Sequence, residues 1–288
     1  MLRSGRKNVV RSPLIFQSDF GLGDGAVSAM YGVANGVDNS LKIFDLTHEI
    51  PPYNIWEGSY RLLQTISYWP EGSVFVSVVD PGVGSERRSV VAKTASNHYI
   101  VTPDNGTLTH IHQQIGITQI RIIDENINRL PNSGASHTFH GRDIYAYSGA
   151  RLASNTISFE DVGPEGDLGS IVQLPFLSAN LEDGVLSGMI DVLDVRYGNL
   201  WTNISRSLLM ELGVEYGGHV KVAIDHDGTR VYVKKMIYGK SFADNNVGEA
   251  LIYINSLDNV AVAINQASFA EKYQIGTGID WKINISKG

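Results

Sequence analysis

The sequence predicts an N-terminal α/β domain with a mainly parallel central sheet, followed by a smaller all-β domain that is a barrel or a sandwich. Strand-like apolar runs alternate with helical patterns up to about residue 164, as in α/β domains. Beyond Pro164 the helical patterns nearly stop, and short β-rich segments are separated by turns such as Asp227-Gly228. The 288 residues leave room for two domains, which we place at residues 1–170 and 180–288.

The first domain is expected to begin with a buried strand over residues 14–18, a glycine-rich turn and a helix over residues 25–37. The remaining strands are apolar runs bounded by turn residues, and we expect them at residues 41–46, 74–79, 88–95, 98–101 and 119–123. The remaining helices have apolar residues at helical spacing, and we expect them at residues 55–69, 107–114 and 141–154.

The second domain is expected to consist almost entirely of strands. Its candidate strands are short, rich in β-branched residues and separated by turns, and they cover residues 184–194, 219–225, 229–235, 250–255 and 260–264. This pattern alone does not distinguish a barrel from a sandwich.

Composition narrows the class of protein. Hydrophobic residues make up 43% and charged residues 18% of the chain, a balance typical of soluble globular proteins rather than disordered ones. The net charge of −7 disfavours nucleic acid as a partner, since phosphate binding needs clustered positive charge. No apolar run approaches the ~20 residues that span a bilayer. The basic N-terminal stretch, residues 1–13, is not followed by the long apolar segment of a secretory signal.

Cysteine is absent, which excludes disulfides, thiolate nucleophiles and cysteine-ligated metals. His110 and His112 lie two residues apart, so on a helix they would not share a face. We therefore expect a cytoplasmic protein without a metal site or a cofactor.

Polar and glycine-rich stretches follow several of the predicted strands. Ligands in α/β sheets bind beyond the carboxyl ends of the strands. Each stretch alone has an ordinary explanation, such as a helix cap, a turn or solvated surface charge. Their coincidence at one edge predicts a polar pocket built from "SDFGLGDG" (18–25), "DLTHEIPPY" (45–53), "VVDPGVGSERR" (78–88) and "TPDNG" (102–106), with "FHGRD" (139–143) opening a nearby helix.

These stretches, with "DVRYGNLWTNI" and "NS…AVAINQ" of the second domain, resemble the S-adenosyl-L-methionine (SAM) hydrolase family, also called SAM hydroxide adenosyltransferases. The family is related to the fluorinating and chlorinating adenosyl enzymes. The resemblance implies that the second domain is a β-barrel and that the chain forms homotrimers. It also implies a substrate site between the first domain of one subunit and the second domain of its neighbour. The reaction implied is metal-free attack of water or hydroxide at C5′ of SAM, which releases adenosine and methionine.

The resemblance assigns catalytic roles to three residues of the first domain: Asp80, Arg87 and His140. A sulfonium is already a good leaving group, so the difficulty lies in the nucleophile. A carboxylate, a guanidinium and an imidazole around one water can orient it, accept its proton and stabilise hydroxide character. We expect Arg87 to point toward Asp80, and Arg88 to be structural.

The resemblance also implies substrate-binding residues in both domains. Asp19 corresponds to the carboxylate that holds the ribose hydroxyls, and Tyr53 to an aromatic beside the sugar. In the second domain the residues implied to hold adenine and the methionine part are Asp194, Tyr197, Asn199 and Ser256. The segment Leu257-Asp258-Asn259 departs from the small residue, glycine and aromatic common in the family, which affects the predicted local backbone.

Two alternatives remain open. The first is a SAM- or adenosine-binding protein with little turnover, although binding alone does not need a water-activating trio. The second is an adenosyl halogenase. In the fluorinating relatives a hydroxylated aromatic, a threonine and a serine stand at the positions of Asp80, Val83 and Gly141. A carboxylate at position 80 repels a halide, so the sequence favours hydrolysis.

Overall fold

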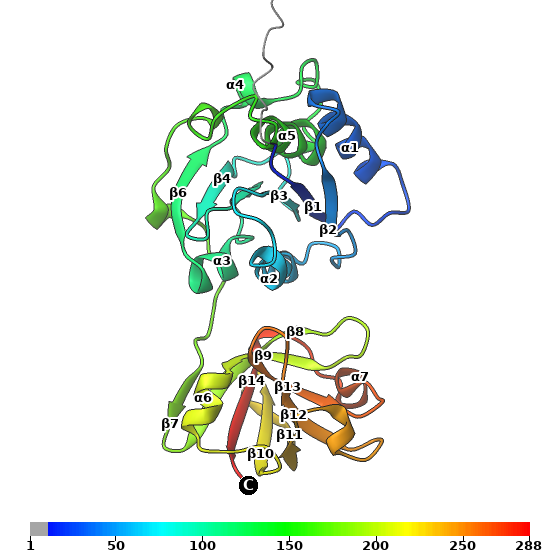
Figure 1. Ribbon diagram of the computed structural model, residues 1–288, viewed down its shortest axis with the longest axis vertical. Coiled ribbons are helices and arrows are strands. Elements are labelled where there is room, and N and C mark those ends of the chain that lie inside the picture. Colours follow the sequence, from blue (N-terminus) through cyan, green and yellow to red (C-terminus); the bar gives the residue numbers. More distant parts are fainter. Residues whose placement is uncertain (1–10) are drawn as a thin grey trace, which may run out of the picture. The chain divides into compact units, whose positions relative to one another are not determined.

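A computed structural model describes residues 11–288, and it divides the chain into two compact units between Leu174 and Pro175 (Figure 1). Most of the basic N-terminal stretch, residues 1–10, lies outside the described residues. None of the described helices is long and apolar enough to cross a membrane.

The first unit is built on a six-stranded sheet in the order β2-β1-β3-β5-β4-β6. Its neighbours pair in parallel from β2 to β5, and only β4 runs antiparallel to both of its neighbours, so the predicted mainly parallel sheet is confirmed. The strands are β1 (Leu14–Ser18), β2 (Ile43–Thr47), β3 (Val74–Val78), β4 (Ser89–Thr94), β5 (Tyr99–Pro103) and β6 (Ile117–Ile122).

Helices cover both faces of this sheet, which explains why β1 and β3 are buried along their whole length. Leu14 and Phe16 pack in one core with α1 (Ala26–Val37) and α5 (Tyr147–Ala153), whereas Ile15 packs on the opposite face with α2 (Ile55–Ile66) and α3 (Thr109–Gln114) (Figure 1). The first turns of the helix predicted at residues 141–154 are π-helical, η1 (Gly141–Ala146), and only the rest is α5. The remaining short helices are α4 (Glu125–Asn128), η2 (Glu160–Val162) and η3 (Leu168–Ser170).

The second unit is a closed β-barrel, so the barrel is confirmed over the sandwich. Seven strands follow in the order β14-β10-β11-β12-β13-β9-β8, and pairing of β14 with β8 closes the ring. The strands are β8 (Val185–Leu193), β9 (Leu200–Ser205), β10 (His219–His226), β11 (Thr229–Tyr238), β12 (Ala250–Ile254), β13 (Asn259–Ile264) and β14 (Gly278–Lys287), with β7 (Asn180–Glu182) added at β8. Three short helices complete the unit: α6 (Arg206–Glu211), η4 (Phe242–Asp244) and α7 (Phe269–Tyr273).

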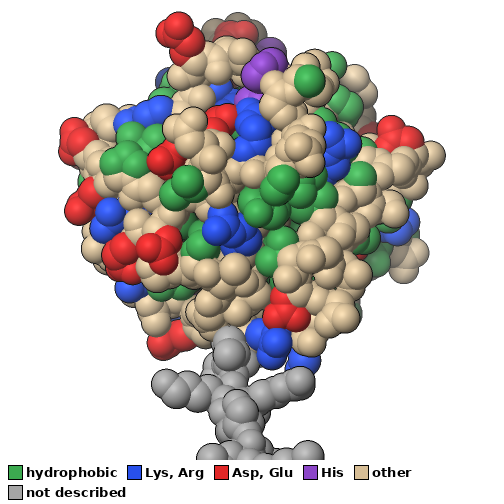
Figure 2. All heavy atoms as spheres, turned by 90° about the horizontal axis from the view of Figure 1, so that it is seen from above, with side chains coloured by type: hydrophobic (Ala, Val, Ile, Leu, Met, Phe, Trp, Pro, Cys, Tyr) green, Lys and Arg blue, Asp and Glu red, His purple; other side chains and the backbone are tan. Residues whose placement is uncertain are grey.

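Two of the barrel strands, β9 and β14, are not among the strands predicted from sequence. Both strands are needed to close the barrel. Strand β14 pairs with both β10 and β8, and strand β9 lies between β8 and β13. On the face shown in Figure 2, basic side chains are scattered among acidic and hydrophobic ones rather than gathered in one patch.

Candidate active site

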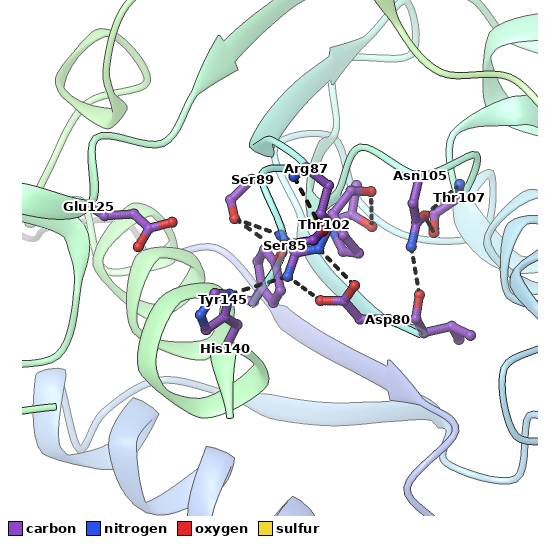
Figure 3. Close-up of polar contacts among 12 residues, drawn as sticks. Asp80, Ser85, Arg87, Ser89, Thr102, Asn105, Thr107, Glu125, His140 and Tyr145 are labelled. Atoms are coloured by element: carbon purple, nitrogen blue, oxygen red, sulfur yellow. Dashed lines mark hydrogen bonds and ion pairs between the residues drawn. The ribbon is translucent and has the colours of Figure 1, made fainter. Parts of the chain in front are cut away.

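The three predicted catalytic residues reach one place in the first unit from three different segments. Asp80 follows β3, Arg87 precedes β4, and His140 stands immediately before η1. In Figure 3 their side chains converge around the guanidinium of Arg87. The structure therefore brings all three together.

Arg87 and Asp80 form a two-pronged ion pair. Arg87 Nε donates to Asp80 Oδ1 at 2.7 Å, and Arg87 Nη2 donates to the other carboxylate oxygen. The side chains are only 10% and 5% exposed. Such fork-to-fork pairing fixes both groups in orientation as well as distance. The expectation that Arg87 points toward Asp80 is confirmed.

The turn between these residues depends on glycine at position 84. Gly84 has a φ of 81°, a conformation that side chains with a Cβ rarely adopt. A Cβ there would also lie 3.1 Å from the carbonyl oxygen of His137. The tight turn after Asp80 therefore lets the chain reverse and return Arg87 to the carboxylate.

Two residues that the sequence did not single out support Arg87 from behind. Arg87 Nη1 donates to Ser89 Oγ at 3.2 Å, and Ser89 Oγ lies 3.1 Å from the hydroxyl of Tyr145. The guanidinium also lies over the Tyr145 ring, 5.6 Å from its centroid. Burial raises the pKa of the Tyr145 phenol, so that hydroxyl remains protonated and neutral. The guanidinium is thus held on three sides.

His140 lies between two guanidiniums. Its Nδ1 is 3.2 Å from Arg87 Nη2, and its Nε2 is 3.4 Å from Arg129 Nη2. Arg129 in turn donates to Glu125 at 2.6 Å. Burial lowers the pKa of His140, and the charges of Arg87 and Arg129 lower it further, while Glu125 and Asp80 oppose them. His140 is therefore a neutral imidazole at neutral pH, and one of its two nitrogens carries a lone pair.

Asp19 and Tyr53 are also brought together. Asp19 follows β1, and its Oδ2 accepts a hydrogen bond from the Tyr53 backbone N–H at 2.8 Å. Tyr53 has a φ of 68°, and its side chain is turned outward with 74% of the residue exposed. Ser18 pairs with Val78 across the parallel strands β1 and β3, so Asp19 and Asp80 leave the sheet at the same edge.

Arg88 has a different role from its neighbour Arg87. Its Nε donates to Asp104 at 2.9 Å, and its Nη1 and Nη2 donate to the hydroxyl and carbonyl oxygens of Ser170 at 2.8 and 2.6 Å. Asp104 Oδ1 also accepts from the backbone N–H of Val172. These bonds tie the chain after η3 to the sheet, so the structural role expected for Arg88 is confirmed.

In the second unit, Asp194 organises the loop between β8 and β9. Its Oδ1 accepts from the backbone N–H groups of Arg196 and Tyr197 at 3.1 and 3.3 Å, and its Oδ2 accepts from Asn199 Nδ2 at 3.4 Å. Asn199 is buried, whereas Tyr197 is 69% exposed. The loop thus exposes an aromatic side chain, while its carboxylate and amide are bonded to each other.

Ser256 belongs to a different turn of the second unit. It is exposed in the turn between β12 and β13, at the end where Asn259 pairs with Ser205. Asn199 immediately precedes Leu200, the residue at the opposite end of β9.

The unusual segment after Ser256 forms a well-defined turn. Asn255 Oδ1 accepts from the backbone N–H groups of Leu257 and Asn259 at 2.9 and 3.1 Å. Asp258 takes a φ of 61° and pairs with Arg206 at 2.7 Å. The departure from the family pattern is therefore accommodated by an asparagine-capped turn.

Two family models match the chain. One, described as SAM hydroxide adenosyltransferase N-terminal domain, matches residues 14–163, and the corresponding C-terminal domain matches residues 188–282. A Methanocaldococcus jannaschii protein named (R)-S-adenosyl-L-methionine hydrolase is 34% identical over 259 residues, covering 88% of this chain and 85% of that protein. A Salinispora arenicola protein of the same name is 32% identical over 263 residues, covering 91% and 94%.

A fluorinase of Actinopolyspora mzabensis is also similar, with 27% identity over 300 residues that cover 96% of this chain and 98% of that protein. Among solved structures, an uncharacterised conserved protein of Thermotoga maritima matches with a TM-score of 0.85 and 30% identity, covering 95% of this chain and all of that one. Hydrolases and halogenases thus both resemble this chain.

Proposed function

The chain belongs to the SAM hydroxide adenosyltransferase family, as its motifs indicate, and we propose that this enzyme hydrolyses SAM to adenosine and L-methionine. The observation that supports hydrolysis most directly is the cluster of Asp80, Arg87 and His140. A protein that only binds SAM has no need of a buried carboxylate, guanidinium and neutral imidazole in mutual contact.

In the proposed reaction, a water oxygen forms a bond to C5′ as the C5′–S bond breaks. The bonding pair passes to sulfur, so the sulfonium becomes the neutral thioether of methionine, and one water proton leaves through the cluster. Asp80 accepts a hydrogen bond from the water, and Arg87 stabilises its growing negative charge. The lone pair of neutral His140 can take the proton when its contact with a guanidinium gives way. In-line positioning of the water supplies a further part of the rate.

The charge balance of the cluster suits a cationic substrate. Asp80 neutralises Arg87, Glu125 neutralises Arg129, and His140 is uncharged. The cluster therefore has no net charge to repel the sulfonium, and Asp19 at the same edge of the sheet adds a negative charge that attracts it.

The halogenase alternative fits this structure less well. A halide at the proposed water position would face the Asp80 carboxylate. A Cβ at Gly141 would lie 3.1 Å from the Phe20 ring and 3.4 Å from Val78, so a serine there would require the ring to shift. The similarity to fluorinases makes the direct test necessary: chloride or fluoride added to the assay should yield no 5′-halo-adenosine.

Hydrolysis itself is tested by incubating the purified protein with SAM in ¹⁸O-labelled water and separating the products. We expect equal amounts of adenosine and methionine, with the label in the 5′-hydroxyl of adenosine. Bound SAM that stays intact would instead show a binding protein with little turnover.

We further propose that the active form is a homotrimer whose site combines Asp80 of one subunit with Asp194 of another. The test is complementation between Asp80→Ala, which lacks the catalytic carboxylate, and Asp194→Ala, which binds SAM weakly, assayed at a SAM concentration well below the KM of the second variant. Mixed trimers exceed the summed activity of the separate variants if the site is shared between subunits, whereas a site within one subunit gives no gain over that sum.

A further inference from the structure

One motif of the candidate pocket, "DLTHEIPPY", has so far supplied only Tyr53. At its centre, His48 is 3% exposed, compared with 5% for His140, and it lies at the carboxyl end of β2 beside β1. A buried histidine needs partners for both ring nitrogens, and the identity of those partners indicates its role.

His48 belongs to a hydrogen-bond chain that begins at the turn after β1. The Phe20 backbone N–H donates to Ser18 Oγ at 3.3 Å, and Ser18 Oγ lies 2.7 Å from His48 Nδ1. On the other side of the ring, His48 Nε2 lies 3.1 Å from Asp45 Oδ1, which also accepts from the Tyr31 hydroxyl.

The direction of each hydrogen bond follows from the groups at the two ends of the hydrogen-bond chain. A carboxylate only accepts, so in the neutral ring the proton is on Nε2 and points to Asp45, and Nδ1 accepts from the hydroxyl of Ser18. Burial, followed by the bond to Asp45, raises the pKa of Tyr31, which keeps that phenol a donor. Every donor in the chain then has an acceptor.

The backbone of His48 holds the same turn from its other end. Its carbonyl oxygen accepts from the Gly21 N–H at 2.7 Å. The side chain and the carbonyl of one residue therefore hold Ser18 and Gly21, and Asp19 lies between these two fixed points. Asp19 in turn accepts from the Tyr53 N–H, five residues beyond His48.

The sequence of groups resembles a serine–histidine–aspartate triad, but Ser18 is not a nucleophile. It is 0% exposed within β1, and its oxygen already accepts from Phe20. No substrate carbonyl can approach an oxygen in that setting. The chain can position the neighbouring backbone, however, because each of its bonds fixes an orientation.

We propose that His48 is a positioning residue that sets the place of Asp19, and through it Tyr53, for binding of the ribose. This inference rests on the proposed function, in which Asp19 holds the ribose hydroxyls. The contact between His48 and Ser18 positions Asp19, because Ser18 directly precedes Asp19 in the chain. Asp45 orients the imidazole ring from its other side.

Two substitutions separate the two ring nitrogens. In His48→Asn the amide oxygen can take the place of Nδ1 and keep the bond to Ser18. In His48→Gln the longer amide can take the place of Nε2, keeping Asp45 and losing Ser18. His98→Asn is the matched control, because His98 is equally buried at 3% but contacts Ser96 and Trp69 instead.

The readout is discrimination between adenosine and 2′-deoxyadenosine, measured as the ratio of their dissociation constants by calorimetry. If the Asp19 carboxylate accepts a hydrogen bond from the 2′-hydroxyl, the unaltered protein should bind adenosine on the order of 10 to 100 times more tightly than 2′-deoxyadenosine. We expect His48→Gln to lose most of this ratio, His48→Asn to keep most of it, and His98→Asn to keep all of it. A ratio that is lost in Asp19→Asn but unchanged in His48→Gln, or an effect as large in His98→Asn, overturns the proposal.

Hydrogen exchange separates this inference from the proposed function. In His48→Gln the amides of Phe20, Gly21 and Tyr53 should exchange faster, whatever ligand the site takes, and in His98→Asn they should not. If exchange rises as expected while Asp19→Asn leaves the ratio unchanged, the ribose role assigned to Asp19 is wrong and the positioning of Asp19 by His48 stands. If exchange at these amides does not rise, the positioning role is wrong.

Discussion

In the first unit the candidate site residues hold one another in place, whereas in the second unit they are held by their own loops. Asp80, Arg87 and His140 come from distant segments and contact each other through side chains that are almost fully buried. Asp194 instead bonds the backbone of its own loop, and Tyr197 and Ser256 face outward. Catalytic groups benefit from being held by one another, because small displacements lower the reaction rate. A binding surface, in contrast, must remain accessible to its ligand.

The sharpest test of this contrast is Asp80→Asn. The amide has the same shape but cannot accept the water's hydrogen bond as a charged group, so we expect kcat to fall by about 10²- to 10⁴-fold. SAM binding, measured by calorimetry, should weaken far less than kcat falls, even though the cluster gains a net positive charge, and a melting curve controls for folding. A large loss of affinity with kcat intact would place Asp80 among the binding residues and remove the contrast.

Arg87→Lys should have the next largest effect. Lysine keeps the charge but not the planar fork that binds both oxygens of Asp80 and reaches Ser89. We expect kcat to fall by roughly 10- to 100-fold with KM nearly unchanged. Arg88→Lys is the matched control: it breaks an equivalent pair with Asp104 and should lower the melting temperature without a comparable loss of kcat.

In the second unit, Asp194→Ala should act on KM rather than on kcat. The loop loses its bonds to Arg196, Tyr197 and Asn199, which we expect to raise KM by about 5- to 30-fold. Asp280→Ala, an exposed aspartate of the same unit, serves as control. A kcat effect as large as that of Asp80→Asn would show that the two units do not divide binding and chemistry in this way.

The smallest expected effect is a shift in pH dependence. The pKa of His140 lies below 6.5, so activity that needs the neutral ring should fall only as the pH drops below that value. Arg129→Gln removes a nearby positive charge and should move this acid limb to higher pH, whereas Glu125→Gln should move it to lower pH. Profiles of kcat/KM against pH for both variants check the opposite signs, and a shift in the same direction would contradict them.

The same depressed pKa bears on stability. Because the folded protein resists protonation of His140 more than the unfolded chain does, its contribution to the free energy of unfolding is complete above pH 6.5. That contribution is lost as the pH falls from 6.5 toward the pKa of the folded state. Melting temperatures measured across this range should therefore decrease less in His140→Gln.

The first sheet could be predicted closely because buried parallel strands are continuous apolar runs. Leu14–Ser18 is found within the expected limits, and only the ends of other elements differ, such as α2, which stops at Ile66 rather than Trp69. Strand β14 also carries a readable signal, since Trp281, Ile283 and Ile285 alternate with polar residues. The expected strands nevertheless omit this one, which closes the barrel.

The candidate site was predictable where its residues share a short segment. Asp80 and Arg87 are seven residues apart across one glycine-rich turn, so their contact could be expected. The setting of His48 depends on the parallel register that places the end of β2 beside Ser18, and the setting of His140 depends on Arg129, which follows the four-residue helix α4. Such contacts arise from the tertiary fold, and no local pattern marks them.

The closure of the barrel by β14 has a consequence for protein synthesis. Val185 of β8 pairs with Ser286 of β14, about 100 residues further along the chain. At about 5–20 residues per second, a ribosome needs roughly 5–20 seconds to make the intervening segment. During that time the strand edges of β8 and β10 that β14 will cover are unpaired and open to other nascent chains. Completion of the second unit is therefore timed by translation, and the first unit can fold while the barrel is still open.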